Sequence, residues 1–396
     1  MKKNIFLFVL SLFYVSLIPA QDTVSIFYPN GNIKEKFEAI VTAYDTLRVG
    51  SYFFYDADGK LSHQGKYENN KLQGPYYIYY PNGKIKKELH FVSGLKSGEY
   101  EHFNQQGELI EKGFFNTDVL EGEFITYQSS GKPEQVQHFH QGKKNGFVIS
   151  YSKTGLVASN IEYKNDTIHG LYETFYDDGN LNYRGKRIGT AYIDSLFVFY
   201  PSGDTMRRCF YENGKLEGIL KTYYENQKLK STAHYTNGML SGEYIEYFPD
   251  GGAAQRGLYV DNKKTGVWRA FYPSGELFST GNFKESSFDG KWIIYFESGQ
   301  IKQEGIYING VSTGQWSFYH PNGNLWKRGN YVNDTQEGVW CFYNESGDFD
   351  SVILFEHGVM HGLSRFKQGE LWIYGLIKGG EVVPIIDEAL KELIEE

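Results

Sequence analysis

The sequence predicts an all-β protein, an elongated repeat array of antiparallel β-hairpins. The first observation is composition: the 396 residues include 33 Tyr, 29 Phe and 45 Gly. Aromatic residues favour strands and glycines favour turns. The second observation is self-similarity, because glycine recurs at a spacing of 24 residues from Gly50 to Gly362. A fixed period in this range indicates a repeat architecture, which grows along one axis without a single central core.

Four positions of the 24-residue unit carry most of the pattern. We number the unit from Gly50 as position 0, where thirteen of fourteen residues are glycine and Asp194 is the exception. Position 9 is glycine in twelve of thirteen units, with Gln227 the exception. Position 5 is aromatic in all thirteen units, and position 17 in all but one, which has Arg187. This regularity, with no insertion between units, indicates about fourteen equivalent hairpins.

Turn residues divide each unit into two strands. The segments Tyr-Pro-Asn-Gly-Lys at 80–84 and Tyr-Pro-Ser-Gly-Glu at 272–276 separate β-rich runs. Proline presets φ and glycine accepts a positive φ, so these segments predict hairpin turns. A second turn falls near positions 20 to 24, as in Asn237-Gly238. Alternating turns of this kind predict one antiparallel meander.

The pairing of strands can be tested inside the sequence. If positions 7 to 10 form a four-residue loop, position 2 lies opposite position 15. Position 15 is glycine seven times, and its expected partner is aromatic each time. The pairs are Gly65 with Tyr52, Gly113 with Tyr100, Gly185 with Tyr172, Gly257 with Tyr244, Gly281 with Trp268, Gly305 with Trp292, and Gly329 with Trp316. We expect each ring to cover its cross-strand glycine, a known device in sheets.

One feature of the pattern leaves two interpretations open. Positions 2 and 5 have opposite parity, so a regular strand would place their aromatic side chains on opposite faces. Either both faces of the sheet are partly apolar, or a bulge near position 3 or 4 turns the chain.

The unit resembles the MORN-repeat family in its bacterial variant form. The shared motif is G-x-W-x-x-Y-x-x-x-G-x-L-x-x-x-G-x-Y, clearest at Gly266–Phe283, Gly290–Tyr307 and Gly314–Tyr331. The resemblance covers roughly residues 22–375 and implies an antiparallel β array of 24-residue MORN-like units with a scaffold or interaction role. Bacterial relatives are often described as antitoxin-like components of toxin–antitoxin modules.

The two ends differ from the array. Residues 1–20 combine Lys2 and Lys3 with a long apolar stretch and end in Pro-Ala, which is typical of a secretory signal peptide. A membrane anchor is the alternative. We expect the array over residues 21–375 and a tail over residues 376–396. A helical stripe in the tail predicts a short amphipathic capping helix, or a helix that docks a partner. Its residues are Ile385, Ile386, Ala389, Leu390, Leu393 and Ile394.

Charge and cysteine content restrict the partners. The net charge is −8 without a basic run beyond the N-terminus, which argues against nucleic acid and against docking on anionic lipid. No second long apolar run follows residue 20, so no stable membrane span is expected after signal cleavage. Cys209 and Cys341 are five and a half repeats apart, too far for a disulfide. Both are expected to be isolated, small and buried.

The sequence contains no recognisable catalytic, cofactor or metal motif, and we expect a protein that is not an enzyme and binds no cofactor or metal. His138 and His140 lie two apart in one strand, a spacing that places both on one face, where they are candidate metal ligands. No Cys or further His accompanies them, so ordinary strand residues are the preferred interpretation.

Two places are candidate binding sites. Trp268, Trp292, Trp316 and Trp340 occupy position 2 of four successive units and predict a ladder that could stack on a polymer. The alternative is that the rings cover glycines, except Trp340, which faces Ile353. The second place is the irregular unit with Arg187 and Asp194, whose opposite charges could pair and mark a bend or a partner site. Simple decay of the repeat is the alternative there.

Three functional hypotheses follow. The preferred one is a non-catalytic, exported scaffold that binds another protein along its long β surface. The second is a surface protein that binds a cell-envelope glycan through the tryptophan ladder. The third is an antitoxin-like immunity protein for an exported toxin. The signal peptide places all three in the periplasm, at the cell surface or outside the cell.

Overall fold

A computed structural model describes residues 21–42, 44–368, 371–378 and 381–384. These residues form 34 strands and no helix, which confirms the all-β prediction. The chain divides into two compact units, the first ending at Gly170 and the second beginning at Leu171. The expected signal peptide over residues 1–20 and the helical stripe after Pro384 lie outside the described residues.

The first unit contains fifteen complete strands. They are β1 (Asp22–Phe27), β2 (Ile33–Val41), β3 (Thr46–Tyr55), β4 (Leu61–Glu68), β5 (Lys71–Leu72), β6 (Gly74–Tyr79), β7 (Ile85–Val92), β8 (Leu95–Lys96), β9 (Gly98–Phe103), β10 (Leu109–Asn116), β11 (Val119–Leu120), β12 (Gly122–Tyr127), β13 (Pro133–His140), β14 (Lys143–Tyr151) and β15 (Val157–Lys164). The two-residue strands β5, β8 and β11 each precede a longer strand by a single residue. The division between the units falls inside β16 (Thr167–Phe175).

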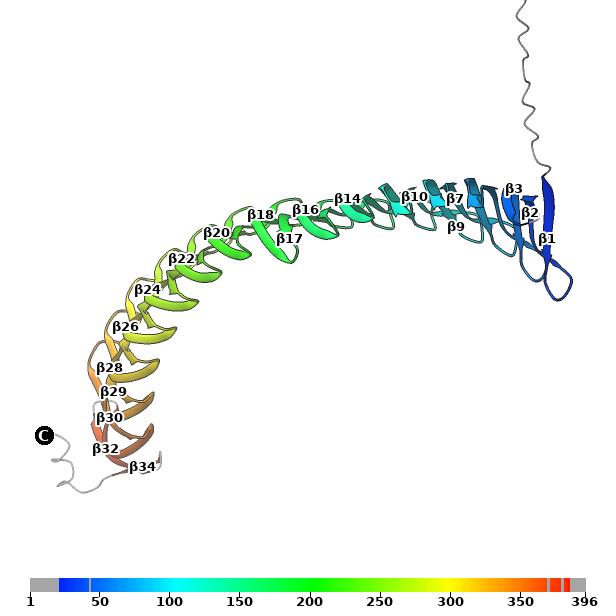
Figure 1. Cartoon of the computed structure of the whole chain (residues 1–396). Coiled ribbons are helices and arrows are strands. Elements are labelled where there is room, and N and C mark those ends of the chain that lie inside the picture. Colours follow the sequence, from blue (N-terminus) through cyan, green and yellow to red (C-terminus); the bar gives the residue numbers. More distant parts are fainter. Residues whose placement is uncertain (1–20, 43, 369–370, 379–380, 385–396) are drawn as a thin grey trace, which may run out of the picture. The chain divides into compact units, whose positions relative to one another are not determined.

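The second unit continues the same alternation. Its strands are β17 (Leu181–Ile188), β18 (Ala191–Phe199), β19 (Thr205–Glu212), β20 (Lys215–Tyr223), β21 (Leu229–Thr236), β22 (Met239–Tyr247), β23 (Ala253–Val260), β24 (Lys263–Phe271), β25 (Leu277–Lys284), β26 (Ser287–Tyr295), β27 (Ile301–Ile308), β28 (Val311–Tyr319), β29 (Leu325–Val332), β30 (Thr335–Tyr343), β31 (Phe349–Glu356), β32 (Val359–Gln368), β33 (Leu371–Lys378) and β34 (Glu381–Pro384). Within each unit, successive hairpins follow one another in chain order (Figure 1) and neighbouring strands pair antiparallel.

The predicted register is confirmed, but the turn that produces it differs from the expected one. Position 2 pairs with position 15, as in Trp268 with Gly281. The loop spans only positions 7 to 9, because the amide of Tyr224 donates to the carbonyl of Lys228 across it. A one-residue β-bulge follows, since Tyr223 pairs with Leu229 and Thr222 with Ser231. Loop and bulge together give the same offset as a four-residue loop.

The second turn of most repeats is a two-residue turn with a positive φ at both residues. In the turn at 189–190 only Gly189 has a positive φ. Asn69 and Asn70 have φ of 51° and 64°, and Asn237 and Gly238 have 52° and 83°. Two positive φ angles define the type I′ turn, whose twist matches that of the flanking strands. Asn, Asp and Gly tolerate this region best, which explains their frequency there.

The two faces of the sheet are different, and this settles the question of parity. One face, the core face, carries positions 2, 15 and 17. Position 5 lies on the opposite, outer face, where the Tyr319 hydroxyl donates to Glu304 of the preceding repeat and the ring is half-buried. The bulge sits at position 12, in the returning strand, rather than at position 3 or 4. Both faces are therefore partly apolar, the first of the two interpretations.

Buried clusters on the core face hold neighbouring repeats together. In the first unit, Tyr76 packs against one cluster around Phe37 and Tyr52, and against another around Leu89, Phe91 and Tyr100. Tyr76 thus contacts side chains from the repeats before and after its own. The core is consequently distributed along the unit rather than gathered at one centre.

The last strands extend beyond the expected end of the array. A boundary after residue 375 is wrong, because β33 continues to Lys378 and pairs with β34. Ile377 is 1% exposed and belongs to the cluster of Trp340 and Phe355. Residues 376–378 and 381–384 therefore belong to the sheet and not to a separate tail.

Candidate functional site

The glycines at positions 0 and 9 are required by backbone conformation. At both positions φ is positive in every described repeat, as in Gly203 with 90° and Gly218 with 72°. The two exceptions in sequence keep the same conformation, Asp194 with φ of 63° and Gln227 also with 63°. Aspartate tolerates this region through local hydrogen bonds, whereas glutamine does so at a cost. These positions are architectural.

Six of the seven glycines at position 15 are required by the rings that cover them, whereas a Cβ at Gly185 would meet only Tyr183 of its own strand. None of them has a positive φ. A Cβ added at Gly305 would overlap the indole of Trp316, although Gly305 pairs in register with Trp292. The covering ring therefore comes from the following repeat, and our expectation of the directly paired ring was wrong. The same relation joins Gly65 to Tyr76, Gly113 to Phe124, Gly257 to Trp268, Gly281 to Trp292, and Gly329 to Trp340.

This packing changes the meaning of the tryptophan ladder. Trp268 and Trp316 are 3% exposed and Trp340 is fully buried, while Trp292 is half-buried. Trp340 covers Gly329, so it is not the exception that its pairing with Ile353 suggested. Rings at position 17 pack edge-on between the indoles, with 5.3 Å between the ring centroids of Tyr331 and Trp340.

A buried ring cannot present its face to a polymer. Burial therefore contradicts the stacking hypothesis for Trp268, Trp316 and Trp340. The ladder instead contributes to stability through apolar burial and edge-to-face aromatic contacts, each worth about 0.5–1.5 kcal/mol beyond the area buried.

The irregular unit around Arg187 and Asp194 is accommodated locally. Asp194 accepts a hydrogen bond from the Lys186 ammonium at 2.7 Å, so the expected pairing with Arg187 is wrong. The Arg187 guanidinium lies 4.9 Å from the ring centroid of Tyr172 and 5.0 Å from that of Tyr192. A planar cation between two rings replaces the aromatic residue that position 17 otherwise carries. This repeat therefore keeps the common architecture, with Arg187 in place of the aromatic residue and Asp194 in place of the glycine.

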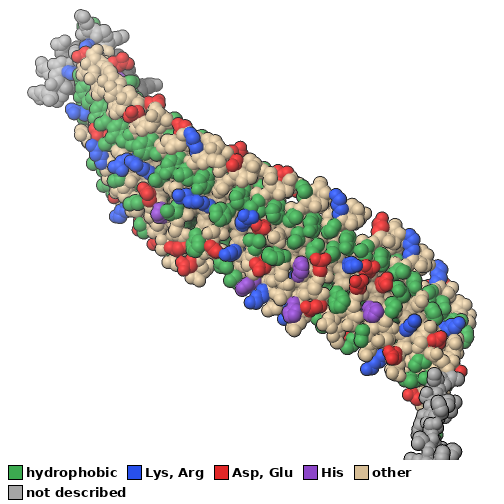
Figure 2. All heavy atoms as spheres, turned by 90° about the horizontal axis from the view of Figure 1, so that it is seen from above, with side chains coloured by type: hydrophobic (Ala, Val, Ile, Leu, Met, Phe, Trp, Pro, Cys, Tyr) green, Lys and Arg blue, Asp and Glu red, His purple; other side chains and the backbone are tan. Residues whose placement is uncertain are grey.

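The outer face carries a row of exposed apolar side chains at positions 1 and 16, which pair across the strands. In several repeats an exposed apolar residue lies opposite a charged one. Such pairs are Phe114 with Glu99, Phe147 with Glu162, Leu258 with Glu243, and Ile306 with Lys291. The four apolar side chains are 40–49% exposed. Figure 2 shows one face of the molecule, on which hydrophobic side chains gather beside charged ones.

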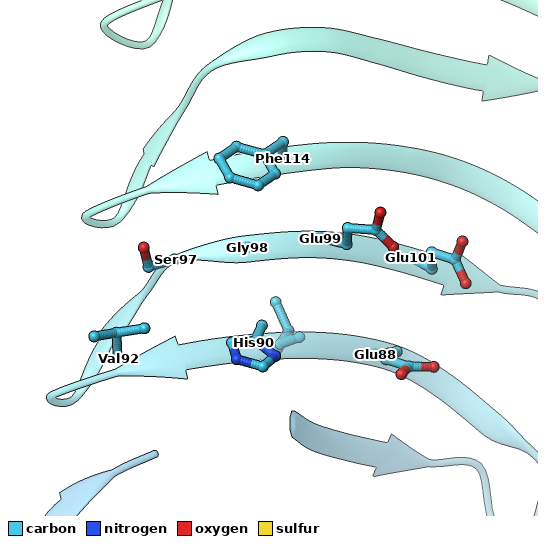
Figure 3. A pocket seen from close by; sticks show the side chains of 9 residues that line it. Glu88, His90, Val92, Ser97, Gly98, Glu99, Glu101 and Phe114 are labelled. Carbon is cyan, nitrogen blue, oxygen red and sulfur yellow. The ribbon is translucent and has the colours of Figure 1, made fainter. Parts of the chain in front are cut away.

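In the first unit, this outer row is hollowed into an acidic groove. Figure 3 shows its first part, with Glu88 and His90 on β7, Glu99 and Glu101 on β9, and Phe114 on β10. The hollow has a volume of about 430 Å³. A second hollow of about 280 Å³ adjoins it and shares Glu99 and Phe114. The acidic groove comprises Glu88, Glu99, Glu101, Glu121 and Glu123 around Phe114.

The groove keeps most of its negative charge. Glu88 and Glu101 lie directly opposite each other in the sheet. Among the residues that the structure describes, only Glu101 has an ammonium partner in the groove. This is Lys112, whose Nζ lies 3.1 Å from Oε1 and whose pKa is raised by that bond. Glu121 accepts hydrogen bonds from the Gln141 amide and from a His140 ring nitrogen, and the amide bond lowers its pKa.

Another hollow, which the repeat pattern did not predict, lies near Trp326 in the compact unit that begins at Leu171. It has a volume of about 340 Å³ and is lined by Phe296, Lys302, Gln303, Phe318, Tyr319, His320, Pro321 and Trp326. Trp326 is 43% exposed, unlike the ladder tryptophans. It occupies position 12, the extra residue of the β-bulge, since Phe318 pairs with Lys327 and Tyr319 with Leu325. An aromatic residue at that variable position was the available signal.

Several other expectations concern individual side chains. No group of three or more His, Cys, Asp or Glu in the described ranges could hold a metal ion. His138 and His140 make separate contacts, with the Phe147 carbonyl and with Glu121. Cys209 is buried and Cys341 only half-buried; both are free thiols. Within residues 21–384 as far as they are described, no helix is long and apolar enough to cross a membrane.

These features define a β-hairpin repeat protein whose aromatic and glycine positions are architectural. The family model of the MORN repeat variant matches seven segments of the chain, at residues 48–69, 72–93, 168–186, 216–237, 264–285, 288–309 and 312–333. The chain belongs to the MORN-repeat family in this variant form. Such repeats indicate a repeat protein with a β-rich protein-binding surface. No curated protein matches the chain.

Several solved structures match the chain at low similarity. One is the crystal structure of TcdB2-TccC3, with 11% identity, a TM-score of 0.14, and coverage of 91% of this chain and 25% of that one. Another is a Photorhabdus luminescens Tc holotoxin pore, with 14% identity, a TM-score of 0.15, and coverage of 92% and 24%. This chain thus spans about a quarter of the length of those chains.

Proposed function

We propose that this chain is an exported, non-catalytic scaffold that binds another protein through the outer face of its repeats. The observation that carries the proposal is the row of exposed apolar side chains at positions 1 and 16, each beside polar or charged groups. Apolar contacts surrounded by charges are the usual composition of a protein interface. Most of the core face is filled by the protein's own aromatic rings.

The acidic groove is the part of this face that we assign to the partner. Phe114 is 45% exposed at the junction of the two hollows and provides an apolar anchor. The surrounding glutamates favour a partner with lysine or arginine side chains, because complementary charge accelerates association and excludes acidic surfaces. Hollow, anchor and charge coincide over β7, β9, β10 and β12.

A matched pair of variants tests this assignment. Phe114 and Phe210 both occupy position 16 and are 45% and 43% exposed, but only Phe114 lies in the acidic groove. Full-length protein carrying Phe114→Ser or Phe210→Ser would be used to capture partners from the native cell envelope. We expect Phe114→Ser to lose a partner that wild type and Phe210→Ser retain, with binding weakened by salt. Identical partners for all three proteins would refute the assignment.

Export is tested separately. Residues 1–22 would be fused to a reporter that is active only outside the cytoplasm. We expect activity, and we expect Lys2→Glu combined with Lys3→Glu to reduce it, because the charged start of a signal peptide is required for export. A silent reporter would reject export and leave the binding proposal to its own test.

A further inference from the structure

We propose that the hollow beside Trp326 binds a pyranose ring of an oligosaccharide. It lies in the second unit and involves none of the residues of the acidic groove, so the proposal is independent of protein binding there. The argument rests on one exposed indole and on the polar side chains of Lys302, Gln303 and His320 beside it.

The indole is placed outward by the β-bulge. As the extra residue of the returning strand, Trp326 has no partner in register, and bulges are known to redirect side chains next to binding sites. Its ring centroid lies 6.4 Å from that of Phe318 and 6.2 Å from that of His320. These neighbours support the ring, while 43% of the residue stays exposed. An aromatic face of this kind packs against the C–H face of a sugar.

Polar atoms around the indole are available to hydroxyl groups. The Gln303 amide makes no hydrogen bond to any residue in the described part of the chain, and the Lys302 side chain is exposed. His320 donates through Nε2 to the Tyr343 carbonyl at 2.9 Å, which leaves Nδ1 as an acceptor when the ring is neutral. Donors and acceptors therefore converge on a hollow with an aromatic wall, the composition expected of a small-ligand site.

The same geometry disfavours an extended peptide. β27, β28 and β29 are each hydrogen-bonded to a strand on both sides, so no sheet edge is open at the hollow for an added strand. Recognition must come from side chains alone. The volume of about 340 Å³ lies at the lower end of the range of about 300–1,000 Å³ seen for small-ligand sites. One sugar ring of a chain that continues into solvent fits these conditions.

Titration of the full-length protein with defined oligosaccharides tests the proposal. The probes are cellohexaose, chitohexaose and tetragalacturonate, which separate neutral, N-acetylated and acidic sugars. Binding would be followed by calorimetry and by tryptophan fluorescence. We expect at least one probe to bind saturably, and Trp326→Ala to weaken it at least tenfold. Gln303→Ala should weaken the same probe several-fold, because the amide contributes hydrogen bonds.

Phe278→Ala is the matched control. Phe278 occupies position 12 of another repeat and is 38% exposed, but it does not line this hollow, so binding should be unchanged. Both residues are exposed, and circular dichroism should show that both variants are folded. The proposal is overturned if no probe binds at millimolar concentration, or if Trp326→Ala binds as well as wild type. Binding of decaproline in place of every sugar would also overturn it and would assign the site to a peptide.

Discussion

Glycine has two separate physical roles in this repeat. At positions 0 and 9 it supplies a positive φ, which any L-residue adopts only at a cost of about 1–2 kcal/mol. At position 15 it supplies space, because the indole or phenyl ring of the next repeat occupies the volume of a Cβ. The two roles respond differently to substitution, so they can be separated by experiment.

The variant Gly305→Ala tests whether position 15 must leave room for the covering ring. The new methyl group would overlap Trp316, which is 3% exposed and has no room to move. Overpacking of this kind costs about 1–3 kcal/mol, so we expect a lower denaturation midpoint in urea. Gly185→Ala is the control, because its Cβ would meet only the end of Tyr183, at 3.3 Å. Equal losses in both variants would contradict the covering role of the ring.

Backbone strain at position 9 is tested by Gln227→Gly. Gln227 has φ of 63° where every other described repeat has glycine. Glycine removes the strain of a left-handed backbone conformation but adds conformational entropy to the unfolded chain. The net effect should stabilise the protein by about 1 kcal/mol. Gln227→Ala keeps the strain and should leave the melting temperature near that of wild type. If glycine and alanine behave alike, strain at this position is negligible.

Sequence reasoning found the correct pairs at position 15 but chose the wrong ring. Gly281 has a tryptophan in register on each side, Trp268 before it and Trp292 after it. A strict repeat makes the two neighbours equivalent in sequence. Only the side-chain torsions decide which ring leans over the glycine, and these are not visible in residue spacing.

At the level of the hairpin, side chains in the turns connect each repeat to the next. Tyrosine at position 6 donates to the carbonyl at position 5 of the following repeat, as in Tyr200 with Tyr223 and Tyr224 with Tyr247, both at 2.8 Å. His320 makes the same bond to Tyr343. At the second turn, Asp118 and Asp166 accept from backbone amides of the preceding repeat. In the repeats that carry these side chains, hydrogen bonds thus link both turns to the neighbouring repeats.

The contribution of the tyrosine bond is tested by Tyr224→Phe. The change removes one hydroxyl and leaves a carbonyl that water can reach only in part, so we expect a loss of about 0.5–1.5 kcal/mol. Tyr223→Phe is the control, since its hydroxyl has no partner within the residues described. Thermal melting of the two variants should separate them by a few degrees. A larger effect of Tyr223→Phe would show that ring packing, rather than the bond, is important.

The stabilisation that hydrogen bonds at the second turn provide should depend on pH. The Ser312 amide donates to Asp334 at 2.7 Å and its hydroxyl donates to the same carboxylate, which holds the pKa of Asp334 below its usual value. A depressed pKa means that the stabilisation is complete above the unfolded pKa of about 3.9 and is lost as pH falls through the folded value. Wild type should therefore melt above Asp334→Asn at pH 7, and the difference should shrink at pH 3. A constant difference would exclude the carboxylate as its source.

Sequence reasoning at this level recovered the hairpins but not the surface they form. The 24-residue period identifies positions that every repeat requires, such as Gly50 and Tyr55. The same backbone conformation and the same packing recur at these positions in each repeat. The acidic groove depends on Glu88, Glu99 and Phe114, which come from three strands and belong to no recurring motif. The groove to which we assign the partner is therefore built from residues that break the period, and residue spacing alone does not show which of them meet.

On the scale of the whole chain, the repeats depend on their nearest neighbours only. Six of the seven position-15 glycines are covered by a ring of the next repeat, and in most repeats a backbone hydrogen bond links the second turn to the neighbouring repeat. Stability in such an array is a sum of repeat and interface terms. A complete repeat should therefore be removable, provided that the faces of the following strands are preserved.

Removal of residues 266–289 tests this dependence. The deletion joins Thr265 to Gly290, so Trp292 follows Gly257 at the spacing that Trp268 had and should cover it in the same way. We expect a folded protein whose melting temperature changes by only a few degrees. Deletion of residues 266–288 is the control: it removes one residue fewer, and a one-residue slip sends every following side chain to the opposite face. That variant should lose cooperative melting, and equal melting of the two deletions would contradict a register fixed by the 24-residue period.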